Sequence, residues 1–198
     1  LKRAEARTTN RWPVTPLLVL AITVGGGILR FYQIGSKGLW LDEAFSVWLG
    51  WQPPGEMLAW LLKIDQHPPL YYTLLHFWMV LGDDAATLRA LSALLSTLTI
   101  PVIFLLGRRL ADTQVGLLAA LILAASPFHV RFAQETRMYA LLTLNVTLAL
   151  YALARLLTDP RAAQVPLGQQ LIALWQTWRQ ARAAERQAQP ETAGYERD

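Results

Sequence analysis

The chain contains no cysteine, so neither a disulfide nor a thiolate metal site can be argued from it. Charged residues are also scarce, at 16% of 198 residues, whereas a soluble domain is usually about 25% charged. Apolar stretches separate the charges, and 54% of the residues are hydrophobic. This composition indicates an integral membrane protein. The net charge of +4 favours contact with anionic lipid head groups and not with nucleic acid, because the basic residues stand at the ends of apolar segments.

The apolar stretches predict an all-α fold, a polytopic bundle of membrane helices. Four of them approach the ~20 residues that span a bilayer, at about residues 13–34, 88–106, 111–130 and 138–157. We expect a basic cytoplasmic N-terminus at 1–12, a membrane domain at 13–160, and a cytoplasmic amphipathic helix with a polar tail at 161–198. The first stretch lacks a small-residue cleavage site, which favours a retained helix over a signal peptide.

Residues 35–87, between the first two spans, are predicted to form an external loop with interfacial helices. Its apolar part at 69–81 is 13 residues long, too short for a span, and its tryptophans are typical of a membrane interface. With a cytoplasmic N-terminus, this topology places 8 Lys and Arg residues inside and 6 outside through Arg161, against 7 and 7 if 69–81 crossed. The positive-inside rule therefore favours it by a small margin.

This topology brings polar residues of distant segments to the outer membrane face. Ionisable side chains at membrane depth are costly unless they are paired or hydrated, so they indicate function. The residues concerned are Arg30, Asp42, Glu43, His67, Arg89, Arg131, Gln134, Glu135 and Arg137.

Asp42 and Glu43 are adjacent carboxylates inside the apolar stretch "GLWLDEAFSVWLG". In a partly apolar pocket a carboxylate has a raised pKa, which suits a general base near neutral pH. Carboxylate oxygens also bind hard divalent cations, so a metal requirement is left open. Alternatively, Asp42 caps a short helix and Glu43 lies in its first turn, with both side chains in water.

The other polar residues also have two interpretations each. His67, in "HPPL", lies either at head-group level, where it donates to a phosphate, or in an exposed turn. Arg89 either binds a phosphate bidentately or snorkels or pairs with a nearby aspartate. In "RFAQETRMY", Glu135 and Arg137 hold each other, orient a site or contact a substrate, or else form an ordinary polar hairpin.

Several of these stretches follow one another in a characteristic order: "LRFYQIG", "LWLDEAFSVW", "HPPLYYTLLHFW" and "AASPFHVRFAQETRMYALLTL". In this order they resemble the N-terminal part of the GT-C membrane glycosyltransferases. They are most similar to the glycosyltransferase family 39 branch, with protein O-mannosyltransferases and aminoarabinose transferases as relatives. The resemblance covers about residues 13–157, and "LDEA" with "HPPLYY" at this spacing is its most specific part.

The resemblance implies a GT-C-type N-terminal half whose first external loop carries juxtamembrane helices and an acidic motif. It also implies an enzyme, which transfers a hexose or pentose from a polyprenyl-phosphate donor to a protein, lipid or glycan acceptor with inversion at the sugar carbon. We therefore expect a multi-pass protein of the bacterial plasma membrane, with a cytoplasmic N-terminus and an external active face.

The resemblance also implies roles for individual residues. By motif position, Asp42 is similar to the catalytic acidic residue, with Glu43 beside it. His67, Arg89 and Arg30 match residues expected near the donor phosphate. The supporting residues Gln134, Glu135, Arg137 and Tyr139 lie in "QETRMY", which resembles the "QEARMY" of the family.

The chain differs from this family in extent. Family members are far longer, whereas this chain begins with Leu and becomes polar after residue 160. The leading Leu leaves a fragment and an unusual start codon both open, and the polar end favours a truncated or frameshifted form that is inactive alone. The alternatives are a non-catalytic membrane subunit or lipid-binding scaffold, and a transporter segment. The last is disfavoured because transporters place ionisable residues near the middle of the membrane.

Overall fold

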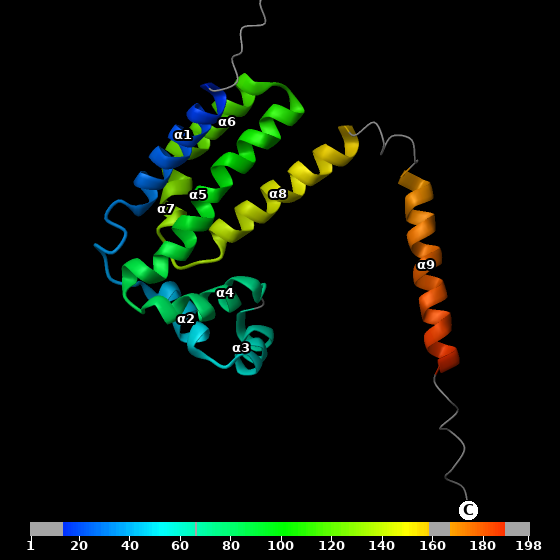
Figure 1. The fold of residues 1–198 in the computed structure, drawn as a ribbon. Helices are drawn as coiled ribbons and strands as arrows, with labels where there is room; N and C mark the ends of the chain where they lie inside the picture. The colour runs from blue at the N-terminus through cyan, green and yellow to red at the C-terminus, as the bar shows by residue number, and fades with distance from the viewer. Residues whose placement is uncertain (1–13, 66, 159–166, 189–198) are drawn as a thin grey trace, which may run out of the picture. The chain divides into compact units, whose positions relative to one another are not determined.

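The computed structural model describes residues 14–65, 67–158 and 167–188, and helices are the only regular elements in these ranges. In chain order, the elements before residue 85 are α1 (Val14–Phe31), α2 (Leu41–Trp51), α3 (Pro54–Trp60), the π-helical turn η1 (Leu61–Asp65), α4 (Leu70–Trp78) and the 3-10 turn η2 (Met79–Leu81). They are followed by α5 (Ala85–Leu110), α6 (Thr113–Ala125), α7 (Pro127–Ala133), α8 (Tyr139–Thr158) and α9 (Leu167–Ala188) (Figure 1).

Three of these helices, α1, α5 and α8, are long and apolar enough to cross a membrane. The predicted all-α bundle of membrane helices is therefore confirmed. The chain is an integral membrane protein.

The predicted span at 111–130 stays a prediction, because its two helices are together long and apolar enough for a span and form either one broken span or a re-entrant loop. It is divided into α6 and α7, which meet at an angle of 59°. Pro127 has no N–H to continue the hydrogen bonds of α6, but it is tolerated as the first residue of a new helix. The Ser126 hydroxyl then accepts a hydrogen bond from the His129 N–H at 3.4 Å and caps α7. The bend brings α7 against α1 and α5 and leads the chain into the polar stretch 134–138.

Helices α1, α5 and α6 pack along one another (Figure 1). Glycines permit the closest contact, between α5 and α6. A Cβ atom on Gly116 would lie 2.6 Å from the carbonyl oxygen of Phe104, and one on Gly107 would lie 2.9 Å from the Cα of Gly116. No side chain fits there, so the two backbones touch directly.

The loop 35–87 folds into its own small layer, in which α2, α3 and α4 gather at one end of the long helices (Figure 1). A buried apolar cluster holds this layer together and joins it to α5. Its members include Val47, Leu49, Met57, Leu61, Tyr71, Tyr72, Leu75, Leu88 and Leu91. The segment Leu70–Leu81 is shorter than the candidate spans, and its interfacial placement stays a prediction.

Helix α9 belongs to a second compact unit, which begins at Arg155. Within α9, Trp175 and Trp178 are exposed. The guanidinium carbon of Arg179 lies 4.0 Å from the centroid of Trp175, and that of Arg182 lies 5.2 Å from Trp178. The predicted basic N-terminus at 1–12 and the tail from residue 189 lie outside the described residues.

Candidate functional site

Asp42 and Glu43 both lie in the first turn of α2, where negative charge interacts favourably with the helix dipole. Successive residues of a helix point about 100° apart, so the two side chains enter different surroundings. Glu43 is fully buried, whereas the Asp42 side chain is 43% exposed. The two carboxylates therefore have different chemistry.

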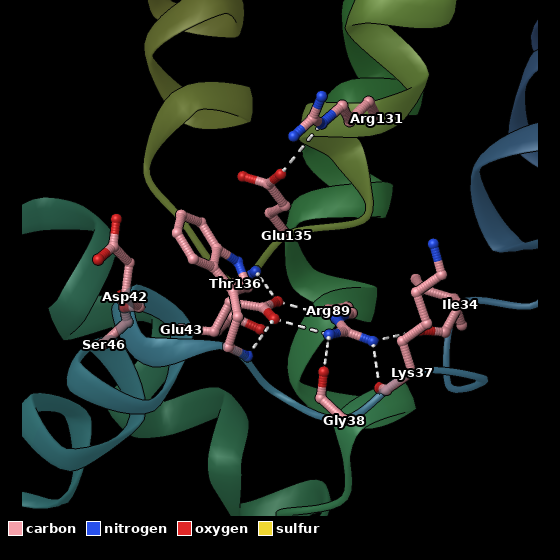
Figure 2. Close-up of polar contacts among 11 residues, drawn as sticks. Ile34, Lys37, Gly38, Asp42, Glu43, Ser46, Arg89, Arg131, Glu135 and Thr136 are labelled. Carbon is pink, nitrogen blue, oxygen red and sulfur yellow. Dashed lines mark hydrogen bonds and ion pairs between the residues drawn. The ribbon is translucent and has the colours of Figure 1, made fainter.

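The Glu43 carboxylate forms a two-point ion pair with Arg89 of α5 (Figure 2). Arg89 Nε donates to Oε1 at 2.8 Å, and Nη2 donates to Oε2 at 2.6 Å. The backbone N–H groups of Thr136 and Trp40 donate to the same carboxylate at 2.9 and 3.3 Å. One buried carboxylate thus joins α2, α5 and the 134–138 segment.

Burial alone would raise the pKa of Glu43, but the hydrogen bonds from Arg89 and from the Thr136 and Trp40 backbones outweigh it and lower the pKa below its ordinary value. The raised pKa predicted for this pair of carboxylates is therefore wrong for Glu43. A fully bonded carboxylate is also a poor metal ligand. Within the described part of the chain, no three His, Asp or Glu side chains are grouped closely enough to hold a metal ion.

Arg89 uses its remaining hydrogens to hold the loop before α2. Nη1 donates to the carbonyls of Ile34 and Lys37 at 2.9 and 2.8 Å, and Nη2 donates to that of Gly38 at 3.0 Å (Figure 2). A guanidinium has five N–H groups, and Arg89 has a partner for each. The structure therefore leaves no N–H of Arg89 for the donor phosphate that it was predicted to bind.

Arg30, near the end of α1, is fully buried and equally saturated. Nε donates to the Ser96 hydroxyl at 2.7 Å, and Nη2 donates to His129 Nδ1 at 2.7 Å. Its other three N–H groups bond to the backbone carbonyls of Gly26, Ala124 and Leu123. Arg30 thus ties α1 to α5, α6 and α7, and the predicted phosphate contact has no free N–H here either.

Asp42 differs because its carboxylate makes no hydrogen bond within the described residues. In Figure 2 it points away from the Glu43 ion pair. Its nearest cation is Arg137, whose Nη2 lies 3.8 Å from Asp42 Oδ2, while Nη1 donates to the Asp42 carbonyl at 3.4 Å. A half-exposed, unbonded carboxylate beside a cation is able to accept a proton from a hydroxyl that approaches it.

A cleft of about 840 Å³ is lined in part by the Glu43 and Arg89 ion pair, but not by Asp42. Its walls include Lys37, Glu43, Arg89, Arg131, Gln134 and Glu135. Burial raises the pKa of Glu135, although Arg131, 3.7 Å away, opposes the shift. The cleft therefore combines a carboxyl group whose pKa is raised with the exposed basic side chains of Lys37 and Arg131.

The remaining predicted residues are spread around this centre. Gln134 donates to the Tyr32 carbonyl at 2.9 Å and so caps the end of α1. The Tyr139 ring packs on Phe132, with centroids 4.9 Å apart. His67 is half-buried in the turn before α4, and α4 packs against α2. Its predicted phosphate contact stays a prediction.

Sequence reasoning missed the partners of these residues. Ser92 and Ser96 lie on the same face of α5 as Arg89, at spacings of three and four residues. Ser92 contacts Tyr71 at 2.8 Å and donates to the Arg137 carbonyl at 3.2 Å, and Ser96 contacts Arg30. This polar stripe within an apolar span could have predicted a buried polar network along α5. The backbone partners at 34–38 and Thr136 could not have been predicted, because every residue type carries the same backbone groups.

Comparison with known proteins supplies the family. A family model described as dolichyl-phosphate-mannose-protein mannosyltransferase matches residues 66–178, more than half of the chain. No curated protein and no solved structure matches the chain. The matched region includes His67, Arg89 and the 134–139 stretch and agrees with the resemblance drawn from the motifs. The chain therefore belongs to the dolichyl-phosphate-mannose-protein mannosyltransferase family, a family of membrane glycosyltransferases.

Proposed function

We propose that this chain carries the catalytic carboxylate of an enzyme that transfers a sugar from a polyprenyl-phosphate donor to a hydroxyl of a protein, lipid or glycan acceptor. Family membership supports a glycosyltransferase with a lipid-linked donor. The observation that carries the assignment is the contrast at the start of α2. Glu43 is buried and fully hydrogen-bonded, while the Asp42 carboxylate is half-exposed and accepts no hydrogen bond from the described residues.

In the proposed reaction, Asp42 takes the proton of the acceptor hydroxyl as its oxygen forms a bond to C1 of the sugar. The bond between C1 and the phosphate oxygen breaks, and its electron pair leaves with the polyprenyl phosphate. Attack from the face opposite the phosphate inverts the configuration at C1. The phosphate leaves as a stable anion, so no general acid is needed. A positioned base contributes about 10²- to 10⁴-fold to such a step.

Glu43 and Arg89 act in this proposal by holding Asp42 in place. Their ion pair fixes the first turn of α2 against α5 and against the loop 34–38. Because all N–H groups of Arg89 already have partners, we assign Arg89 a positioning role in place of the phosphate contact predicted for it. His67 stays in the proposal as a residue near the donor phosphate.

We place this centre at the external face, with the N-terminus in the cytoplasm. The distribution of Lys and Arg supports this orientation. The short length of Leu70–Leu81 supports it too, because a segment that does not cross keeps α2 and the 134–138 segment on one side.

The test is donor turnover by the full chain. The chain is placed in nanodiscs with radiolabelled polyprenyl-phosphate mannose and a hydroxyl-bearing peptide or glycan acceptor, and free polyprenyl phosphate is measured over time. Turnover above that of empty nanodiscs supports the enzyme. Donor that binds but is never consumed with any acceptor contradicts it and favours a lipid-binding scaffold.

A further inference from the structure

Three arginines, Arg30, Arg89 and Arg137, are buried, and they differ in how many of their N–H groups have partners. Arg30 and Arg89 each use all five. Neither can take a further ligand unless an existing bond breaks. Arg137 is the third, and its side-chain contacts are fewer and longer.

The Arg137 side chain is more than nine-tenths buried, with 9% exposed. Its Nε atom is buried and has no hydrogen-bond partner among the described residues. Nη1 makes one long hydrogen bond, 3.4 Å, to the Asp42 carbonyl, and Nη2 lies 3.8 Å from the Asp42 carboxylate, beyond hydrogen-bonding distance. The guanidinium carbon lies 5.7 Å from the centroid of Tyr139.

The backbone holds Arg137 in this position without any ligand. Its N–H donates to the Glu135 carbonyl at 2.8 Å, and its carbonyl accepts from the Ser92 hydroxyl at 3.2 Å. The adjacent Thr136 N–H is bonded to Glu43. The same ion pair that positions Asp42 therefore positions Arg137.

A buried guanidinium with an open N–H is costly unless an anion completes it. The planar fork of arginine binds phosphate oxygens in pairs, with Nε and one Nη donating in parallel. Asp42 does not fill this role, because its carboxylate stands 3.8 Å from Nη2 and does not bond to Nε. The buried Nε beside Asp42 is thus a donor that the phosphate of a substrate reacting there can satisfy.

We propose that Arg137 binds the phosphate group of the polyprenyl-phosphate donor through its unpartnered Nε edge and holds that phosphate beside Asp42. This inference rests on the proposed function and deepens it. Negative charge grows on the phosphate oxygen as the C1–O bond breaks, and a fixed guanidinium there stabilises it without reorganisation. Arg137, in "QETRMY", then supplies the phosphate-binding cation that was predicted at Arg30 and Arg89.

The first test measures binding by the full chain in nanodiscs of zwitterionic lipid. Polyprenyl phosphate is titrated, and the bound species is resolved by native mass spectrometry. We expect Arg137→Gln to weaken binding at least about tenfold and Arg137→Lys to weaken it less, because lysine keeps the charge but loses the fork. Arg108→Gln, at an exposed position in the last turn of α5, is the matched control and should bind like the wild type.

Two competitors identify what the site recognises. We expect millimolar inorganic phosphate and added phosphatidylglycerol to leave most of the polyprenyl phosphate bound. Displacement by inorganic phosphate would overturn the requirement for a lipid-linked phosphate, and displacement by phosphatidylglycerol would overturn selectivity for the polyprenyl lipid. Wild-type binding by Arg137→Gln overturns the assignment. If that variant does not fold, as judged by circular dichroism, wild-type binding by Arg137→Lys overturns it instead.

Asp42→Asn separates this inference from the proposed function. It removes the base but leaves Arg137, so we expect it to bind polyprenyl phosphate at least as tightly as the wild type and to transfer no sugar. If Asp42→Asn transfers sugar while Arg137→Gln loses binding, the base is wrong and the phosphate site stands. If Asp42→Asn is inactive while Arg137→Gln binds normally, the phosphate site is wrong and the base stands.

Discussion

At the scale of single residues, the number of free N–H groups separates structural arginines from a candidate ligand-binding arginine. Arg30, Arg89 and Arg137 are all buried and look equivalent in the sequence. Only their hydrogen-bond partners differ, and many of those partners are backbone carbonyls. A sequence gives the identity of a cation but not the backbone groups that bond to it, so the motif alone cannot tell which arginine keeps N–H groups for a ligand.

Removing one partner of the Glu43 and Arg89 ion pair should destabilise the protein strongly. Glu43→Gln leaves Arg89 as a buried charge without its counterion, which costs about 3–5 kcal/mol of unfolding free energy. Glu56→Gln is the matched control, because Glu56 lies in the first turn of α3 and is exposed. Its effect should stay within about 0.5 kcal/mol.

Chemical unfolding in detergent, followed by circular dichroism, measures both variants. A loss from Glu43→Gln no larger than that from Glu56→Gln would show that the ion pair does not hold α2 in place.

Glu43 and Glu135 should give stability opposite dependences on pH. The pKa of Glu43 is lowered in the folded state, so its contribution is present above the ordinary value of 4.5 and is lost as the pH falls through the folded pKa. The pKa of Glu135 is raised, so its contribution is present below 4.5 and is lost as the pH rises through the folded pKa.

Unfolding free energies measured from acid to neutral pH check these signs. Glu43→Gln should flatten the profile below pH 4.5, and Glu135→Gln should flatten it above that value. Interchanged effects of the two variants would contradict the environments described for these carboxyl groups.

At the scale of elements, the sequence predicted which segments are helices more reliably than how they bend and pack. Apolar length identified α1, α5 and α8, because a span needs ~20 such residues whatever its neighbours are. The break between α6 and α7 was missed although Pro127 was visible, because proline is tolerated inside some membrane helices, as Pro101 is in α5. Tertiary contacts decide between the two outcomes.

The contact between α5 and α6 should depend on Gly116. A Cβ atom there meets the Phe104 carbonyl oxygen at 2.6 Å, and overpacking of this kind costs about 1–3 kcal/mol. Gly25, in α1, is the control because a Cβ atom there meets nothing within 4 Å. Gly25→Ala should therefore stabilise the protein by about 0.4–1 kcal/mol, while Gly116→Ala destabilises it, as thermal unfolding in detergent would show. Equal effects of the two changes would argue against the close packing of α5 and α6.

The membrane topology is best tested with single cysteines, since the chain has none of its own. Glu56→Cys, Asp83→Cys and Gln114→Cys all lie at exposed positions. If Leu70–Leu81 does not cross, an impermeant maleimide should label positions 56 and 83 in intact cells and leave 114 unlabelled. Labelling of 56 without 83 would mean that this segment crosses the membrane.

At the scale of the whole molecule, the sequence predicted the family, and the structure shows how the residues of its motifs are bonded. The motif order pointed to the family, and the family model agrees. The motifs also named Asp42, Glu43, Arg89 and Arg137, which the fold brings together. The sequence could not supply the different surroundings of the two carboxylates, because burial and hydrogen-bond partners distinguish the half-exposed Asp42 from the saturated Glu43.

The most direct measurement is the rate of sugar transfer from polyprenyl-phosphate mannose by Asp42→Asn, with Asp83→Asn as an exposed-aspartate control. Loss of a general base predicts a fall of about 10²-fold or more, with membrane insertion, polyprenyl phosphate binding and the Asp83→Asn rate all unchanged. Transfer by Asp42→Asn at the wild-type rate would contradict the claim that Asp42 is the catalytic base.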